Sequence, residues 1–158
     1  STTQTRQAAS SRWGADLPVL MPDVDVLVYG HREGLHQHPA AAAWLTDLAT
    51  SPRAFAMSEM VVAGFVRVVT SPRVFSSPST IDEALAFVEE LIARPTCRLI
   101  RPGPRHLAIF TGLCREHRAT GALAADAYHA ALAIEHGCTW VKYDTDFARF
   151  TALDWRAP

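Results

Sequence analysis

The chain lacks the features that mark a membrane protein or a disulfide-bonded one. No apolar run approaches the roughly 18 residues that a membrane-spanning helix needs, so we expect no membrane insertion. The three cysteines are odd in number and lie far apart, which argues against a disulfide framework and favours a reducing cytoplasm. The sequence contains no internal repeat, so a repeat architecture is not expected either.

A strong charge of one sign is missing too, because the 158 residues carry a formal net charge of −1. This balance alone does not indicate a nucleic-acid binder, and Lys142 is the only lysine. Arginines are frequent in the middle of the chain, where they could line a path for phosphates or simply cover solvated helix faces. They are Arg67, Arg73, Arg94, Arg98, Arg101, Arg105, Arg115 and Arg118.

Length and composition suit one soluble domain, with 49% hydrophobic and 20% charged residues. Residues 1–17 are mostly small and polar, so we interpret them as a flexible N-terminal extension. Residues 18–158 then form a single folded domain.

Short apolar strands alternate with helical stretches along this domain. We predict strands at residues 18–23, 54–57, 97–100 and 139–142, with a short fifth at 153–155. Helices are predicted at residues 24–29, 39–50, 60–69, 80–92, 105–117 and 122–136. The third of them is apolar enough that we expect it to be buried throughout. Such alternation predicts an α/β fold in which helices flank a short, mainly parallel sheet.

Carboxylates recur at four points along the chain, next to the predicted strands and helices. Asp23 ends the first predicted strand and Asp144 follows the fourth, at the carboxyl ends where parallel sheets bind ligands. Glu59 follows a plausible N-cap, Ser58, and Asp126 lies in an Ala-rich helix. If the fold gathers these acids, protons or a bound cation must relieve their repulsion.

The chemistry of these acids indicates a metal site for reactions on phosphates. Oxygen-only ligands without Cys or His suit Mg²⁺ or Mn²⁺. A divalent ion can neutralise a phosphodiester and lower the pKa of an attacking water. If five carboxylates are taken up by such a site, the rest of the chain has a positive net charge, which suits a nucleic-acid substrate. The five are Asp23, Glu59, Asp126, Asp144 and Asp146.

The order of these motifs resembles that of PIN-domain ribonucleases, and most closely that of the VapC toxins of bacterial toxin–antitoxin pairs. The resemblance rests on residues 22–29, 58–70, 125–137 and 143–150, and it covers residues 18–158. It implies a Rossmann-like α/β domain that cuts RNA with Mg²⁺, for which Mn²⁺ could substitute. Asp25 departs from the pattern, because many relatives carry Asn, Ser or Thr there. Lys142 and Tyr143 replace residues that are often small and polar.

The resemblance also implies a role for each acid. Asp23, Asp126 and Asp144 match the family's metal ligands. Glu59 and Asp146 match further catalytic acids, which support the reaction or hold a second metal ion, although either could merely cap a helix. Asp25 could bind the metal or only orient a neighbouring ligand.

Partners follow from the same resemblance. It implies an RNA substrate, a cognate VapB-type antitoxin that blocks the acidic site, and a homodimer. Helix faces around Trp44, Leu45, Phe65 and Phe87 are candidates for the antitoxin groove, unless they belong to the core.

Three other interpretations are weaker. Asp23-Val24-Asp25 after a strand resembles the start of haloacid-dehalogenase-like phosphatases, in which Asp23 would be the nucleophile, but Glu59 and Asp126 have no place in that scheme. A binding module with a catalytically silent acidic pocket is a second alternative. His31, His36 and His38 could suggest zinc, but their spacing fits no zinc pattern. For His129, a packing or a surface role is favoured over an approach to substrate.

Overall fold

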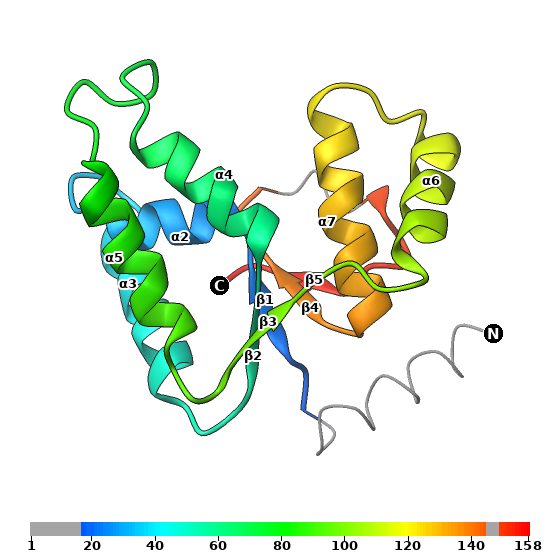
Figure 1. Cartoon of the computed structure of the whole chain (residues 1–158), viewed down its shortest axis with the longest axis horizontal. Helices are drawn as coiled ribbons and strands as arrows, with labels where there is room; N and C mark the ends of the chain where they lie inside the picture. The colour runs from blue at the N-terminus through cyan, green and yellow to red at the C-terminus, as the bar shows by residue number, and fades with distance from the viewer. Residues whose placement is uncertain (1–16, 145–148) are drawn as a thin grey trace. The chain divides into compact units, whose positions relative to one another are not determined.

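The computed structural model describes residues 17–144 and 149–158 (Figure 1). These residues form two compact units. The central unit comprises Pro22–Ile100 and Pro158, and the terminal unit comprises the residues up to Met21 together with Arg101–Ala157.

The central unit contains four helices and two parallel strands among its described residues. The helices are α2 (Val24–His31), α3 (His38–Thr50), α4 (Glu59–Val69) and α5 (Ile81–Ile92). The strands β2 (Phe55–Ser58) and β3 (Cys97–Ile100) pair in register from Phe55 with Cys97 to Ser58 with Ile100. Each element lies within three residues of the position predicted for it.

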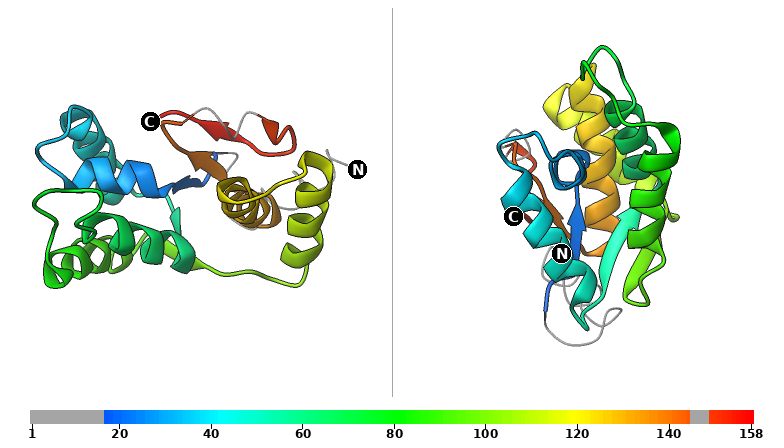
Figure 2. Two further views of the ribbon diagram at one scale, coloured as in Figure 1. Left: turned by 90° about the horizontal axis from the view of Figure 1, so that it is seen from above. Right: turned by 90° about the vertical axis from the view of Figure 1, so that its left-hand side faces the viewer.

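Local chemistry explains where these helices begin and how they pack. The side chain of Thr80 accepts a hydrogen bond from the Glu83 backbone, and the Glu83 side chain accepts one from Thr80. Together the two bonds form a capping box at the start of α5. Gly30 lets α2 approach α3 closely, because a Cβ there would collide with the side chain of Leu45. In Figure 2, α4 and α5 run side by side in the same unit.

The prediction that the helix at 60–69 is buried throughout is wrong. In α4 only Val61, Phe65 and Val69 are buried, and the Met60 side chain is 37% exposed. The buried positions are four residues apart and form one stripe of the helix. The remaining valines and Ala63 are partly or fully accessible. The apolar sequence of α4 therefore did not imply that every face of the helix is buried.

The terminal unit contains α6 (His106–His117) and α7 (Ala122–His136), which lie side by side (Figure 1). Its strands are β4 (Thr139–Val141), β5 (Trp155–Arg156) and β1 (Leu20–Pro22), whose last residue belongs to the central unit. β4 and β5 are parallel, and the Thr139 backbone donates a hydrogen bond to the Val19 carbonyl beside β1. Gly137 ends α7 with φ of 67°, a left-handed conformation for which glycine is preferred at the C′ position.

Glu135 ties the start of α6 to the end of α7. Its buried carboxylate accepts hydrogen bonds from the backbone of Gly103 at 2.7 Å and of Arg105 at 2.8 Å. Burial opposes ionisation, but these bonds and the nearby His136 and His106 hold the pKa of Glu135 below its ordinary value. Sequence patterns did not identify this contact, because it joins residues about thirty positions apart.

Each unit has its own buried side chains. Phe55, Phe65 and Leu27 are fully buried in the central unit, as are Trp140 and Leu132 in the terminal unit. The strand pairs recorded are parallel and helices separate the strands along the chain, which confirms the predicted α/β class. Within the described residues, no helix combines the length and the apolar character required to cross a bilayer.

Candidate functional site

Asp23 lies directly after β1 and caps α2. Its backbone is extended, with φ of −78° and ψ of 170°, and its carboxylate accepts a 2.6 Å hydrogen bond from the Val24 backbone. The side chain is only 8% exposed. The helix N-terminus stabilises its negative charge, and the cap fixes the direction of the carboxylate. Asp25 follows in the first turn of α2 and is half-buried.

Ser58 and Glu59 repeat this arrangement at the end of β2. The buried Ser58 hydroxyl accepts a 3.1 Å hydrogen bond from the Val61 backbone, so it is the N-cap of α4, as predicted. Glu59 occupies the first turn and is exposed. Further along α4, a Cβ on Gly64 would approach a methyl group of Val24 to 2.9 Å. The absence of a side chain at Gly64 thus lets α4 pack against the start of α2, next to Asp23.

Asp126 lies on α7, one helical turn before His129. His129 is buried and stacks on Trp140 of β4, with ring centroids 5.1 Å apart and planes at 19°. Burial, and then the Lys142 ammonium, lowers the pKa of His129 to about 4. Its Nδ1 has no hydrogen-bond partner among the described residues. Of the packing and surface roles predicted for His129, these contacts show packing.

Lys142 and Asp144 follow β4. The Lys142 side chain is 4% exposed, and its Nζ lies 3.8 Å from Oδ2 of Asp144, whose side chain is half exposed. In the sequence Lys142 stands out as the only lysine, but it is not among the residues predicted to form the metal site. A single lysine directly before an acid pair was the signal available.

The acids fall into two groups in the structure. Asp23, Asp25 and Glu59 belong to the central unit, whereas Asp126 and Asp144 belong to the terminal unit. Asp146 lies outside the described residues. Among the residues that are described, no three His, Cys, Asp or Glu side chains form a group that could hold a metal ion.

Two of the three histidines of the zinc alternative, His31 and His38, make other contacts. His31 lies against the rings of Phe65 and Phe87, and its Nε2 is 2.9 Å from the Ser79 hydroxyl. Burial, and then Arg32, lowers the pKa of His31. The Nδ1 of His38 is 2.9 Å from the Tyr29 carbonyl. These contacts hold the end of α2 and the loop before α5 in place.

Several of the arginines that could have lined a phosphate path hold local structure instead. Arg94 forms an ion pair with Glu90, and Arg98 donates hydrogen bonds to the carbonyls of Pro95 and Cys97. Arg105 donates one to the carbonyl of Glu135. Arg67, Arg73, Arg115 and Arg118 are exposed.

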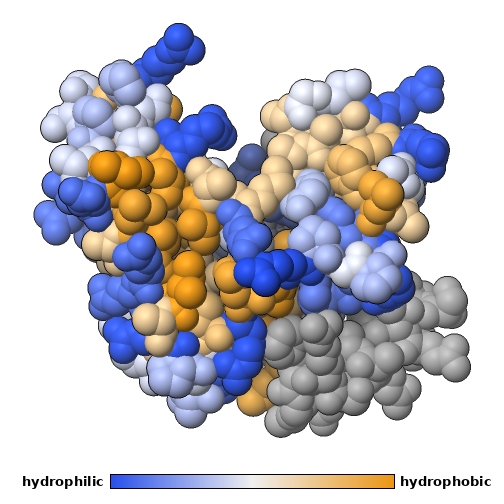
Figure 3. Space-filling view, in the orientation of Figure 1, coloured by the Kyte–Doolittle hydropathy of each residue, from blue (hydrophilic) through white to orange (hydrophobic). Residues whose placement is uncertain are grey.

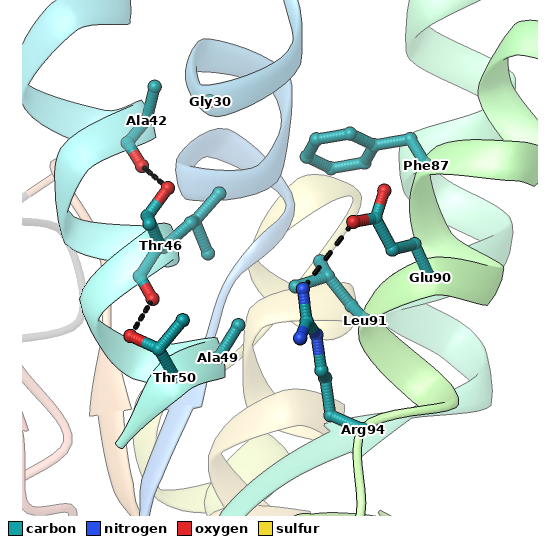
Figure 4. Close-up of a pocket in the computed structure, with 10 residues that line it drawn as sticks. Gly30, Ala42, Thr46, Ala49, Thr50, Phe87, Glu90, Leu91 and Arg94 are labelled. Carbon is teal, nitrogen blue, oxygen red and sulfur yellow. Dashed lines mark hydrogen bonds and ion pairs between the residues drawn. The ribbon is translucent and has the colours of Figure 1, made fainter.

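The central unit has a pocket of about 200 Å³ between α3 and α5 (Figure 4). Leu45 and Phe87 contribute to its apolar wall, and the Arg94–Glu90 pair lies on the α5 side. Phe65 is fully buried and stacks on Phe87, so it belongs to the core. Apolar residues also gather on the surface of the same unit in Figure 3. Ile81 and Leu85 of α5 are exposed.

Comparison with known proteins agrees with this fold. The PIN-domain family model matches residues 20–153. The chain is 41% identical over 140 residues to ribonuclease VapC43 of Mycobacterium tuberculosis, an alignment that covers 89% of this chain and 95% of the relative. It is 40% identical over 131 residues to ribonuclease VapC25 of the same organism, covering 83% of this chain and 92% of that one.

Solved structures share the fold at low sequence identity. A chain of VapBC2 from Rickettsia felis, bound to a promoter DNA fragment, superimposes with a TM-score of 0.66 at 18% identity, covering 88% of this chain and 98% of the other. A chain of VapBC-1 from nontypeable Haemophilus influenzae gives a TM-score of 0.61 at 17% identity, covering 88% and 97%.

These matches define the class of the protein as an α/β PIN domain. The chain belongs to the PIN-domain family, and its similarity to VapC ribonucleases extends over most of its length. The phosphatase and silent-module alternatives receive no support from these comparisons.

Proposed function

We propose that the chain is a metal-dependent ribonuclease of the VapC type, which cuts RNA phosphodiester bonds and is neutralised by a cognate VapB-type antitoxin. The observation that carries this proposal is the 41% identity to a VapC ribonuclease across 95% of that relative's length. The acid positions support it, because Asp23 and Glu59 begin helices directly after strands, and Asp144 follows β4.

In this proposal Asp23, Asp126 and Asp144 hold a divalent ion, and Glu59 and Asp146 support the reaction. The donor set fits Mg²⁺, with Mn²⁺ as a substitute, because both ions prefer carboxylate oxygens and water over Cys or His. When bound, such an ion would neutralise the phosphate and make an attacking water more acidic.

The residues of the chain contribute orientation. The cap on α2 fixes the Asp23 carboxylate through the Val24 backbone, and the Ser58 cap places Glu59 in the first turn of α4. Ligands held in this way lose less conformational entropy when they bind an ion. Asp25, in the turn after Asp23, orients a neighbour in our proposal and does not bind the ion directly.

The pocket between α3 and α5 is a candidate site for part of the antitoxin. Its apolar wall at Leu45 and Phe87 suits the apolar face of a helical segment. This partly retains the groove predicted from sequence, although Phe65 belongs to the core and Trp44 does not line the pocket. A homodimer is proposed from the same family relationship.

A cytoplasmic location and an extension at residues 1–17 remain proposals. Cys97 and Cys114 are free thiols, as a reducing compartment would allow. Residues 1–16 lie outside the described part of the chain.

The test is cleavage of purified total RNA by protein freed of any partner, with Mg²⁺, with Mn²⁺ and with EDTA, followed by mapping of the new RNA ends. We expect cutting only with a divalent ion. Full cleavage in EDTA would contradict the metal mechanism. Zinc stimulation that depends on His31 or His36 would instead favour a histidine site.

A further inference from the structure

Lys142 is a buried cation at the carboxyl end of β4. It is the only lysine of the chain, and its side chain is 4% exposed. Lysines are among the residues least often buried, because removing an ammonium from water is costly unless anions compensate its charge. The burial of Lys142 therefore indicates negative charge close by.

Asp144 supplies one such charge. Its Oδ2 lies 3.8 Å from the Lys142 Nζ, which is an ion-pair distance but longer than a hydrogen bond. The Asp144 side chain is 52% exposed, whereas that of Lys142 is almost fully covered. The ammonium thus approaches Asp144 from the protein side and leaves the outer part of the carboxylate accessible.

The position of Lys142 directly after β4 directs its side chain toward α7. The Lys142 backbone donates a hydrogen bond to the Arg156 carbonyl of β5, which continues the pairing of β4 by one residue. Lys142 is two residues after Trp140, so their side chains point to the same face. Trp140 stacks on His129 of α7, and the Lys142 charge contributes to the low pKa of His129. The Lys142 ammonium therefore lies on the α7 side of β4.

Asp126 of α7 and Lys142 lie at similar positions along the direction of α7 and β4. Two residues join α7 to β4, so the strand runs back along the helix that precedes it. Moving from Trp140 to Lys142 advances about 6.6 Å along the strand. Moving from His129 back to Asp126 covers about 4.5 Å in the same direction. Lys142 is therefore placed near both proposed metal ligands of the terminal unit.

We propose that Lys142 is a positioning residue of the acidic site, whose ammonium holds the Asp144 carboxylate and limits how tightly the site binds a divalent ion. This inference rests on the proposed function, because it takes Asp126 and Asp144 as metal ligands. A fixed positive charge beside those carboxylates offsets part of their repulsion without metal and repels an incoming cation.

The first test measures Mn²⁺ binding by titration calorimetry without RNA. Lys142→Met removes the charge but keeps an unbranched side chain. It should tighten Mn²⁺ binding on the order of tenfold, the effect expected of one charge acting on a divalent ion several ångströms away in a partly hydrated site. Lys142→Arg keeps the charge and should retain wild-type affinity. Arg115→Met, which removes an exposed charge from α6, is the control and should change nothing.

The second test needs no metal. Urea unfolding of metal-free wild type, Lys142→Met, Asp144→Asn and the double variant forms a double-mutant cycle. If the two side chains are paired, the change in unfolding free energy of the double variant should differ from the sum of the changes in the two single variants. Additive effects would overturn the proposal, as would unchanged or weaker Mn²⁺ binding by Lys142→Met. If wild type binds no Mn²⁺, the proposed metal mechanism fails, and the cycle still decides whether Lys142 holds Asp144.

Discussion

His129 stacks on Trp140 with ring centroids 5.1 Å apart, and the stack joins the middle of α7 to β4. Asp126 is one turn before His129, and Lys142 is two residues after Trp140. The stack therefore fixes where Asp126 and Lys142 lie relative to each other along the helix and the strand. A neutral imidazole suits this position, since the histidine is buried and Lys142 is nearby. The stack therefore links the packing of the terminal unit to its proposed site residues.

The first prediction concerns the pH dependence of stability. The pKa of His129 is lowered from 6.5 to about 4, so the unfolded chain takes up a proton at a higher pH than the folded protein does. The stability that neutral His129 contributes is full above pH 6.5 and is lost as the pH falls toward 4, by about 3 kcal/mol. Urea unfolding of His129→Phe, which keeps a stacking ring, should show a smaller loss than wild type over that range. Parallel plots of unfolding free energy against pH for the two proteins would contradict this prediction. The control is His36→Gln, at an exposed histidine, which should follow the wild-type plot.

The second prediction concerns the proposed metal ligands. Asp23→Asn and Asp126→Asn should each lower RNA cleavage by more than the roughly 10- to 100-fold typical of groups that only orient a ligand. Asparagine is as good an N-cap as aspartate, so Asp23→Asn should keep α2 intact. Without metal and above the carboxylate pKa values, both variants should be at least as stable as wild type, because repulsion is relieved. A clearly lower melting temperature in both would mean that these residues are structural.

Asp25 provides the third prediction. It lies in the first turn of α2, half-buried, where an acid is favoured by the helix N-terminus whether or not a metal is bound. Asp25→Asn keeps the shape and a hydrogen-bond acceptor, so cleavage should fall modestly, by about tenfold, which is the lower end of the range for a residue that orients a neighbour. The measurement is a Mg²⁺ titration of cleavage by wild type and variant. A large shift of the midpoint to higher Mg²⁺ would show that Asp25 binds the ion directly.

The fourth prediction compares two N-caps of the central unit, Ser58 and Thr80. Ser58→Ala and Thr80→Ala each remove an N-cap, of α4 and α5 respectively, and each should cost about 1 kcal/mol of stability. Only Ser58→Ala should also reduce cleavage, by several-fold, because Ser58 places Glu59. Equal cleavage by the two variants would show that Glu59 does not depend on its cap.

Gly64 provides the fifth prediction. Alanine normally stabilises a helix relative to glycine by about 1 kcal/mol, but at Gly64 its Cβ would approach Val24 to 2.9 Å. Gly64→Ala should therefore be neutral or destabilising and should reduce cleavage, since Val24 adjoins Asp23. Gly112→Ala is the control, because nothing lies within 4 Å of its Cβ on α6, and it should raise the melting temperature. Equal stabilisation by both changes would contradict the close packing of α4 on α2.

Local signals in the sequence determined most of the secondary structure. The capping residues Ser58 and Thr80, and Gly137 after α7, act through hydrogen bonds or backbone angles within a few residues, so they can be recognised without a fold. The alternation of strands and helices likewise predicted the α/β class. The acids next to predicted strand ends could be identified because their role is tied to their position in the order of elements.

Tertiary structure decided what no local pattern carries. Lys142 became buried beside Asp144, and Glu135 came to hold the backbone of Gly103 and Arg105, through contacts set by packing. The apolar run in α4 turned out to be buried on one stripe only, because burial depends on which neighbours cover a helix. The sequence by itself thus determined where the elements begin and which acids follow them. Only the fold decided which charges are removed from water, because that depends on residues distant along the chain.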